Sequence, residues 1–184
     1  MPTTAKKSSA KTSPKKPAAK VATAKPAPAV KSLREGSAAP TCSLALTGNK
    51  TIDLASFKGK KNVVLYFYPK DDTPGCTIEA NDFAKLNKQF DKADTVIIGI
   101  SKDNMKSHDK FRAKYDLPFA LAADESGITE AFGAWGEKSM YGKTYFGIVR
   151  STFLIDKAGK VAKAWPKVNV TGHADEVLKA AQSL

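Results

Sequence analysis

The chain has 184 residues, which is enough for one folded domain with an appendage. It carries 30 Lys and Arg against 18 Asp and Glu, and the resulting formal charge of +12 is unevenly distributed. Two cysteines and two histidines, far apart in the sequence, exclude a disulfide-rich scaffold and form no recognisable zinc motif. No apolar stretch is long enough to cross a membrane, and we expect neither a metal nor an organic cofactor.

Residues 1–35 account for most of this charge. They consist mainly of Lys, Ala, Pro, Ser and Thr, and they hold nine basic residues against one acidic residue. Because no aromatic residue or apolar period occurs there, the segment cannot bury enough surface to offset its ordering entropy. We therefore expect residues 1–35 to form a disordered tail and residues 36–184 to form a folded domain.

Three roles for this tail remain open. Lys-Pro-Ala repeats such as KKPAAK are similar to the basic tails of histone-H1-like and nucleoid proteins, whose charge is enough for non-specific DNA binding. A solvated extension without a partner is the simplest alternative. A cleaved transit peptide is weaker, because the charge comes from Lys rather than Arg. Few cysteines and no apolar export signal favour a cytoplasmic location, with nucleoid association in the DNA-binding case.

Residues 36–60 predict a β-hairpin followed by a short helical turn. Cys42, Leu44 and Leu46 alternate along the first strand, and Gly48-Asn49 supplies the turn. In this alternating apolar set, Cys42 is most simply a small core residue.

The next stretch predicts a buried strand followed by a helix. The apolar run from Val63 to Tyr68, ended by Pro69, is typical of a strand covered on both faces. After a polar loop, Thr73 is a suitable N-cap and Pro74 suits the first helical position. Apolar residues then recur at helical spacing, which predicts a helix over residues 76–90.

This geometry places Cys76 in the first turn of a helix, at the carboxyl end of a buried strand. Free N–H groups and the helix dipole stabilise a thiolate there, which makes the sulfur a nucleophile. Thr73 can offer its hydroxyl, Gly75 leaves the backbone amides open to a small substrate, and Pro69 would shield the site from water. The alternative is an inert, buried cysteine.

The rest of the domain alternates between strands and helices, which predicts an α/β layer sandwich. Strands are predicted at residues 95–100, 119–122, 147–155 and 161–165, and helices at residues 105–115, 172–183 and just before residue 133. Residues 133–147 show no clean period and predict a loop. Its aromatic residues Trp135, Tyr141 and Tyr145 either pack around it or line a substrate mouth or docking surface. We expect His108 and His173 to be exposed or capping residues without a catalytic role.

The spacing Pro69-x-x-x-Thr73-x-x-Cys76 resembles the active-site motif of peroxiredoxins. The longer string FYPKDDTPGCT, with Glu79 after it, resembles the bacterioferritin-comigratory-protein or PrxQ branch. The resemblance implies a thioredoxin-like fold with a mixed central sheet flanked by helices. It also implies a peroxidase that reduces hydrogen peroxide and organic hydroperoxides through a cysteine thiolate.

Arg150 lies in the segment RSTFLID, which carries the same resemblance and implies that this arginine faces the catalytic sulfur. A permanent cation there would stabilise both the thiolate and the charge that develops on oxygen. Glu79 could hold Arg150 in place through a bidentate ion pair. An ordinary edge-strand arginine is the alternative.

The chain departs from this branch in its resolving cysteine. Many members place that cysteine five residues after the first, where this chain has Asn81, and another subgroup places it near the position of Arg112. An external thiol, from thioredoxin, glutaredoxin or a small molecule, would then reduce the oxidised Cys76, unless Cys42 acts as the resolving cysteine. We expect a monomer. A passive domain that carries a DNA-binding tail is the alternative function, and a C-x-x-C oxidoreductase is disfavoured because Thr73 occupies the required position.

Overall fold

The computed structural model describes residues 33–140 and 142–184. Residues 1–32, which make up most of the predicted tail, lie outside the described residues, and so does Tyr141. No helix within the described ranges has both the length and the apolar character needed to span a bilayer.

Strands and helices alternate along the described chain, as the sequence predicts. The strands are β1 (Ser43–Leu46), β2 (Lys50–Asp53), β3 (Asn62–Phe67), β4 (Thr95–Ser101), β5 (Ala120–Ala123), β6 (Trp135–Met140), β7 (Lys143–Ile148), β8 (Ser151–Ile155) and β9 (Val161–Trp165). The helices are α1 (Pro74–Lys92), α2 (Met105–Lys114), α3 (Ile128–Ala131) and α4 (His173–Gln182), with a 3-10 turn at Leu54–Phe57.

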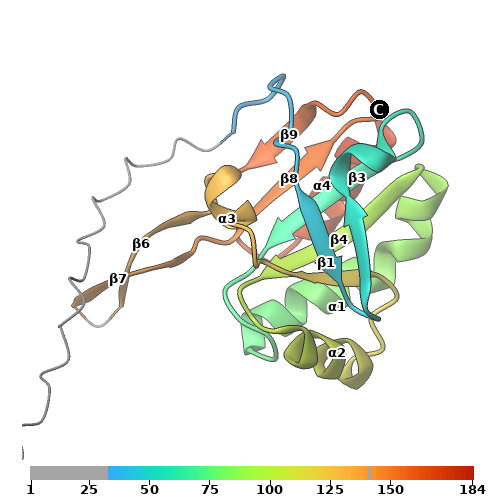
Figure 1. Cartoon of the computed structure of the whole chain (residues 1–184). Coiled ribbons are helices and arrows are strands. Elements are labelled where there is room, and N and C mark those ends of the chain that lie inside the picture. The colour runs from blue at the N-terminus through green and yellow to red at the C-terminus, as the bar shows by residue number, and fades with distance from the viewer. Residues whose placement is uncertain (1–32, 141) are drawn as a thin grey trace, which may run out of the picture.

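The central sheet is mixed and has the strand order β2-β1-β5-β4-β3-β8-β9. β3 lies in its interior, parallel to β4 and antiparallel to β8. Helices α1, α2 and α4 pack on one face of the sheet, and α3 packs on the other (Figure 1). The predicted α/β layering is therefore confirmed, and β3, the strand that precedes the candidate site, is buried along its whole length.

The side chains of β3 alternate between two apolar cores. Tyr66 faces the core beneath α1, α2 and α4, whereas Leu65 and Phe67 face the core beneath α3. All three are fully buried, which explains why β3 reads as a continuous apolar run. Tyr66 lies over Gly99 of β4, where an added Cβ would come within 2.5 Å of the tyrosine hydroxyl. A glycine is therefore required opposite this large ring.

The predicted loop at residues 133–147 is wrong. The segment instead forms a two-stranded antiparallel ribbon of β6 and β7, in register from Trp135 opposite Ile148 to Met140 opposite Lys143. Figure 1 shows this ribbon as an arm that extends away from the central sheet. Most of β7 is exposed, so no buried face imposes an alternating apolar pattern on the sequence.

The single strand predicted over residues 147–155 is also wrong in detail. β7 ends at Ile148 and β8 begins at Ser151, with Val149 and Arg150 between the two strands. The amide of Val149 still donates to the carbonyl of Ala134, next to the last pair of the ribbon, and the chain enters the central sheet only at Ser151. This break frees Arg150 from the sheet ladder.

Both histidines are buried, which corrects the prediction that they are exposed or capping residues. His108 has no exposed surface, and His173 keeps 4% of its surface exposed. The lysines of α2 suggested an exposed helix surface around His108. His108 and Phe111, however, lie about one turn apart on the buried side of that helix.

The residues just before the predicted domain boundary contact the sheet. Leu33 packs against the core beneath α3, and the Glu35 carboxylate accepts a hydrogen bond from the amide of Ala164 in β9. The amide of Gly36 donates to the carbonyl of Val161. The chain therefore contacts the folded domain from Leu33 onward, three residues before residue 36, and it bonds to the edge strand β9 from Glu35 onward.

Candidate active site

Cys76 is the third residue of α1 and lies just beyond the end of β3. Its exposed fraction is 2%. The first helical bond recorded at this end runs from the amide of Thr77 to the carbonyl of Thr73, at 2.8 Å. The amides of Gly75 and Cys76 precede it and have no partner within the helix, so they are available to an anion or an oxygen atom beside the sulfur.

Arg150 connects the sulfur to a buried carboxylate. Its Nη2 atom donates to the Sγ atom of Cys76 at 3.2 Å, and its Nη1 atom forms an ion pair with Glu79. Glu79 is 1% exposed and lies one helical turn after Cys76, on the same side of α1. The guanidinium is therefore fixed from both ends, by the thiol and by the carboxylate.

Burial and charge act in opposite directions on this ion pair. Burial raises the pKa of Glu79 to about 7, although Arg150 opposes the rise. Burial would lower the pKa of Arg150, but the charges of Glu79 and Cys76 more than offset it and raise that pKa instead. Arg150 therefore remains charged, and Glu79 is the member of the pair whose charge depends on pH.

Thr73 occupies the N-cap position of α1, but its side chain does not cap the helix. The hydroxyl donates instead to the carbonyl of Lys70, at 3.0 Å, so it closes the loop that precedes the helix. Gly75 has a second role that the sequence did not reveal. A Cβ at this position would lie 3.4 Å from Nη2 of Arg150, so the glycine leaves room for the guanidinium. Pro69 is half-buried at the start of the same loop.

Cys42 lies away from these residues. It packs against the core beneath α3, whereas Cys76 belongs to the core beneath α1 on the opposite face of the sheet. Burial raises the pKa of the Cys42 thiol to about 11, with the nearby charges of Asp124 and Asp53 adding to the effect. The structure thus brings Gly75, Cys76, Glu79 and Arg150 together, turns the Thr73 hydroxyl to the Lys70 carbonyl in the preceding loop, and separates Cys42 from the group.

The sequence analysis missed a second cation near this group. Lys138 of β6 donates to the carbonyl of Ile148 at 2.9 Å, two residues before Arg150. Burial lowers the pKa of Lys138, the charge of Arg150 lowers it further, and Cys76 opposes both. No sequence signal could have placed Lys138 here, because its position depends on the ribbon that was predicted to be a loop.

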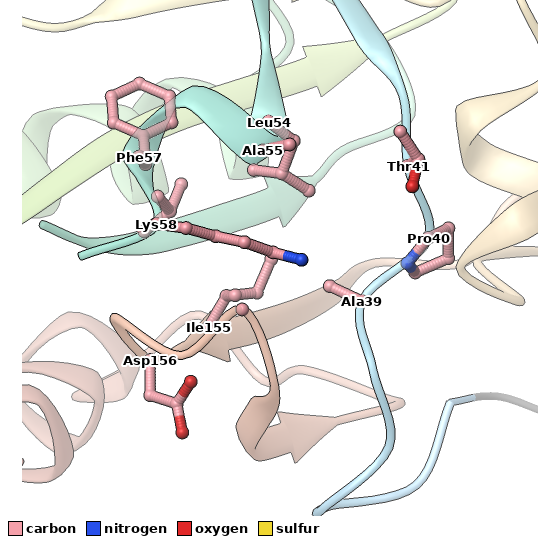
Figure 2. Close-up of a pocket in the computed structure, with 11 residues that line it drawn as sticks. Ala39, Pro40, Thr41, Leu54, Ala55, Phe57, Lys58, Ile155 and Asp156 are labelled. Carbon is pink, nitrogen blue, oxygen red and sulfur yellow. The ribbon is translucent and has the colours of Figure 1, made fainter. Parts of the chain in front are cut away.

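A separate hollow lies at the other end of the sheet and contains none of the predicted site residues (Figure 2). It is lined by residues 39–41, the 3-10 turn and the chain after β8, and the Lys58 side chain extends across it. Its volume of about 20 Å³ is close to that of a single water molecule. Within residues 33–140 and 142–184, no group of three His, Cys, Asp or Glu side chains could hold a metal ion.

Comparison with known proteins connects this geometry to a family. The AhpC/TSA family pattern matches residues 36–164. The chain belongs to the AhpC/TSA family. Peroxiredoxin Bcp from Bacillus subtilis is 47% identical over 150 residues, which are 81% of this chain and 95% of the relative. A putative peroxiredoxin Bcp from Coxiella burnetii is 47% identical over 148 residues, 80% of this chain and 97% of the relative.

Solved structures of AhpC/TSA relatives support the same assignment. Peroxiredoxin Q from Xanthomonas campestris has a TM-score of 0.73 and 47% identity, covering 77% of this chain and 90% of its own. Another structure from that organism, with 46% identity, the same TM-score and the same coverage, is described as a bacterioferritin comigratory protein with alkyl peroxide reduction activity. This chain is therefore a thioredoxin-like peroxiredoxin of the Bcp/PrxQ branch, and its activity is that of a thiol-dependent peroxidase.

Proposed function

We propose that Cys76 is the peroxidatic residue and that Arg150, held by Glu79, is its electrostatic partner. The observation that carries this assignment is the contact of 3.2 Å between Arg150 Nη2 and Cys76 Sγ, with Glu79 bound to the other guanidinium nitrogen. Thr73 and the amides of Gly75 and Cys76 complete the site. Pro69 shields its rim.

In the proposed reaction, the Cys76 thiolate attacks the terminal oxygen of a hydroperoxide. A new S–O bond forms as the O–O bond breaks, so the sulfur is oxidised to a sulfenic acid and the peroxide is reduced. The departing alkoxide, or hydroxide for hydrogen peroxide, takes a proton from water. Arg150 and the free amides stabilise the negative charge that moves from sulfur to oxygen.

We propose hydrogen peroxide and organic hydroperoxides as substrates. The proposed attack needs only a peroxide bond that can reach the Cys76 sulfur. The description of the Xanthomonas campestris relative as active on alkyl peroxides supports the organic class. Comparing the rates of Cys76 oxidation by hydrogen peroxide and by an alkyl hydroperoxide would rank the two.

The proposed reductant is an external thiol, supplied by thioredoxin, glutaredoxin or a small molecule. Asn81 and Arg112 occupy the positions where related chains hold a resolving cysteine. Cys42 lies on the other face of the sheet and its thiol is protonated at neutral pH, so it is a poor nucleophile toward the sulfenic acid. The sulfenic acid therefore waits for a thiol from outside.

Single-turnover kinetics with variants of both cysteines test this proposal. We expect Cys76→Ser to abolish peroxide consumption and Cys42→Ser to match wild type, both in the first turnover and during recycling with a dithiol. Mass spectrometry after one equivalent of peroxide should find an oxygen adduct on Cys76. Peroxide consumption by Cys76→Ser would refute the assignment, and a Cys42–Cys76 disulfide would refute the external-thiol cycle.

A further inference from the structure

A buried polar cluster lies beside the active-site loop and has no place in the mechanism above. It consists of Tyr68, Asp71 and His108, whose exposed fractions are 1%, 7% and 0%. The Tyr68 hydroxyl donates to Oδ1 of Asp71 at 2.6 Å. Nδ1 of His108 lies 3.0 Å from the same oxygen and 2.9 Å from Oδ2. One carboxylate thus joins the end of β3 to the inner side of α2.

The contacts within the cluster keep the carboxylate charged. Burial alone would raise the pKa of Asp71, but the hydrogen bonds from His108 and Tyr68 lower it below its usual value. A buried, charged carboxylate is costly unless it is bonded, and this cluster is not fully satisfied: Oδ2 of Asp71 and Nε2 of His108 have no hydrogen-bond partner among the described residues. An apolar side chain would fill the same space at a lower cost in desolvation free energy. We therefore look for a role of this cluster beyond packing the core.

Asp71 belongs to the loop that leads from β3 into α1. Its amide donates to a carboxylate oxygen of Asp103, at 2.8 Å, just before α2 begins. The neighbouring Lys70 carbonyl receives the Thr73 hydroxyl at 3.0 Å. The side chain of Asp71 therefore ties this loop to α2, and its main chain ties the loop to the turn before α2. The loop in turn leads through Thr73 into the first turn of α1.

We propose that Tyr68, Asp71 and His108 are positioning residues that hold the loop from Pro69 to Thr73 in register with the Cys76 site. The cluster does not touch the sulfur. It sets where the Thr73 hydroxyl and the first amides of α1 lie relative to an incoming peroxide. This inference rests on the proposed role of Cys76 and adds residues that the spacing Pro69-x-x-x-Thr73-x-x-Cys76 does not specify.

Asp72 offers a matched control for Asp71. It is the next residue in the same loop, but it is exposed and bonds to Lys114 and to the Tyr115 hydroxyl at the surface. Asp71→Asn and Asp72→Asn therefore make the same chemical change in a buried and in an exposed setting. Only Asp71→Asn should alter the buried contacts that hold the loop.

Two rates separate positioning from general stability. Peroxide attack needs both peroxide oxygens aligned, whereas alkylation of Cys76 by iodoacetamide needs only an accessible thiolate. We expect Asp71→Asn to slow peroxide attack by at least about tenfold and to change alkylation by less than about twofold. Asp72→Asn should change either rate by less than about twofold. If Asp71→Asn leaves the peroxide rate unchanged, or lowers both rates equally, the proposal is overturned.

Tyr68→Phe provides a second variant in case Asp71→Asn does not fold. It removes only the hydroxyl and keeps the ring that packs against Tyr66 and Phe111. A folded Tyr68→Phe protein should also lose peroxide rate but keep its alkylation rate, and an unchanged peroxide rate overturns the proposal. Wild type and Cys76→Ser in the same assay report on Cys76 itself, so a failure of the catalytic assignment is distinguishable from a failure of the loop assignment.

Discussion

At the scale of single residues, the site depends on one arginine held between a thiol and a buried carboxylate. Arg150 is 17% exposed and reaches Cys76 with one nitrogen and Glu79 with another. Gly75 leaves space beside this arginine, because a Cβ at position 75 would lie 3.4 Å from Nη2 of the guanidinium. The planar fork of arginine suits this double contact better than the single ammonium of lysine.

Replacing Arg150 should slow the chemical step. We expect Arg150→Ala to lower the rate of peroxide attack by at least about tenfold, equivalent to about 1.4 kcal/mol of barrier, because the charge near the developing oxyanion is lost. The rate of peroxide attack by Arg150→Lys should lie between those of Arg150→Ala and wild type, since lysine keeps the charge but lacks the planar, two-pronged guanidinium. Stopped-flow kinetics of Cys76 oxidation would measure both.

The exposed Arg34 provides the control for these variants. Arg34→Ala removes a cation of the same type far from the sulfur in sequence, and its peroxide rate should equal that of wild type. If Arg150→Ala is as fast as Arg34→Ala, Arg150 has no part in the reaction.

At the scale of elements, α1 and α4 pack together on the face of the sheet that carries the site. His173 begins α4, and its ring nitrogen lies 2.8 Å from the Thr152 hydroxyl of β8. Phe83 of α1 and Trp165 of β9 contact the same ring edge-on. This histidine therefore connects α4 to β8, α1 and β9.

His173 should make stability depend on pH. Burial lowers its pKa from 6.5 to about 4, although Glu176 opposes the change. The unfolded chain then binds this proton more tightly than the folded chain. The contribution of neutral His173 to the free energy of unfolding is therefore fully present above pH 6.5 and is lost as the pH falls toward 4. The full loss is at most roughly 3 kcal/mol.

Urea unfolding of wild type and His173→Gln at a series of pH values would test this dependence. Gln cannot titrate but can still bond to Thr152, so the difference in unfolding free energy between the two proteins should shift against wild type in acid. Parallel curves across this range would rule out His173 as the titrating group.

The continuity of α1 determines whether a cysteine at position 81 could resolve Cys76. Five helical residues separate the two Cα atoms by about 7.5 Å along the helix axis, which is beyond comfortable bridging distance. Because α1 already includes Cys76, its first turns must unwind before a bond can form. Arg150 and Glu79 oppose that unwinding.

We therefore expect Asn81→Cys to form a disulfide with Cys76 after one equivalent of peroxide, and to form it faster in mild urea. Thiol counting by mass spectrometry at several urea concentrations below the unfolding transition would measure this. A rate that is independent of urea would mean that unwinding does not limit the reaction, and an absence of disulfide would show that α1 does not open.

At the scale of the whole molecule, charge separates the N-terminal segment from the catalytic domain. Residues 1–32 contain eight Lys and no acidic residue, whereas Leu33 and Glu35 already contact the sheet. Residues 1–32 hold the positive charge on which the predicted DNA binding depends, whereas Leu33 and Glu35 belong structurally to the domain.

Two truncations should therefore behave differently. Deleting residues 1–32 should leave the melting temperature and the peroxide rate unchanged, and should abolish any DNA binding, which in the full chain weakens steeply with salt. Deleting residues 1–35 should, in contrast, lower the melting temperature, because the contacts of Leu33 and Glu35 with the domain are then lost. Calorimetry and a DNA mobility-shift assay at several salt concentrations would measure both, and no shift at low salt would eliminate the nucleic-acid role.

The sequence by itself determined the strand, the loop and the helix around Cys76. A continuous apolar run followed by Thr73, Pro74 and a helical period is a local signal, because it depends on residues next to one another in the chain. The family resemblance added Arg150, which is 74 residues away from Cys76 and which local pattern alone could not have paired with it. Together these signals predicted the fold class and the residues that meet at the sulfur.

Only the tertiary structure decided which face of the sheet each remaining group occupies. The sequence left open whether Cys42 is a core residue or a resolving cysteine for Cys76, and the structure places the two in different cores with the sheet between them. His108 read as a surface residue, but α2 turns it inward onto Asp71. The ribbon of β6 and β7 has no sequence period because most of β7 is exposed to solvent. Each of these outcomes depends on packing between distant segments, and a linear sequence pattern does not encode it.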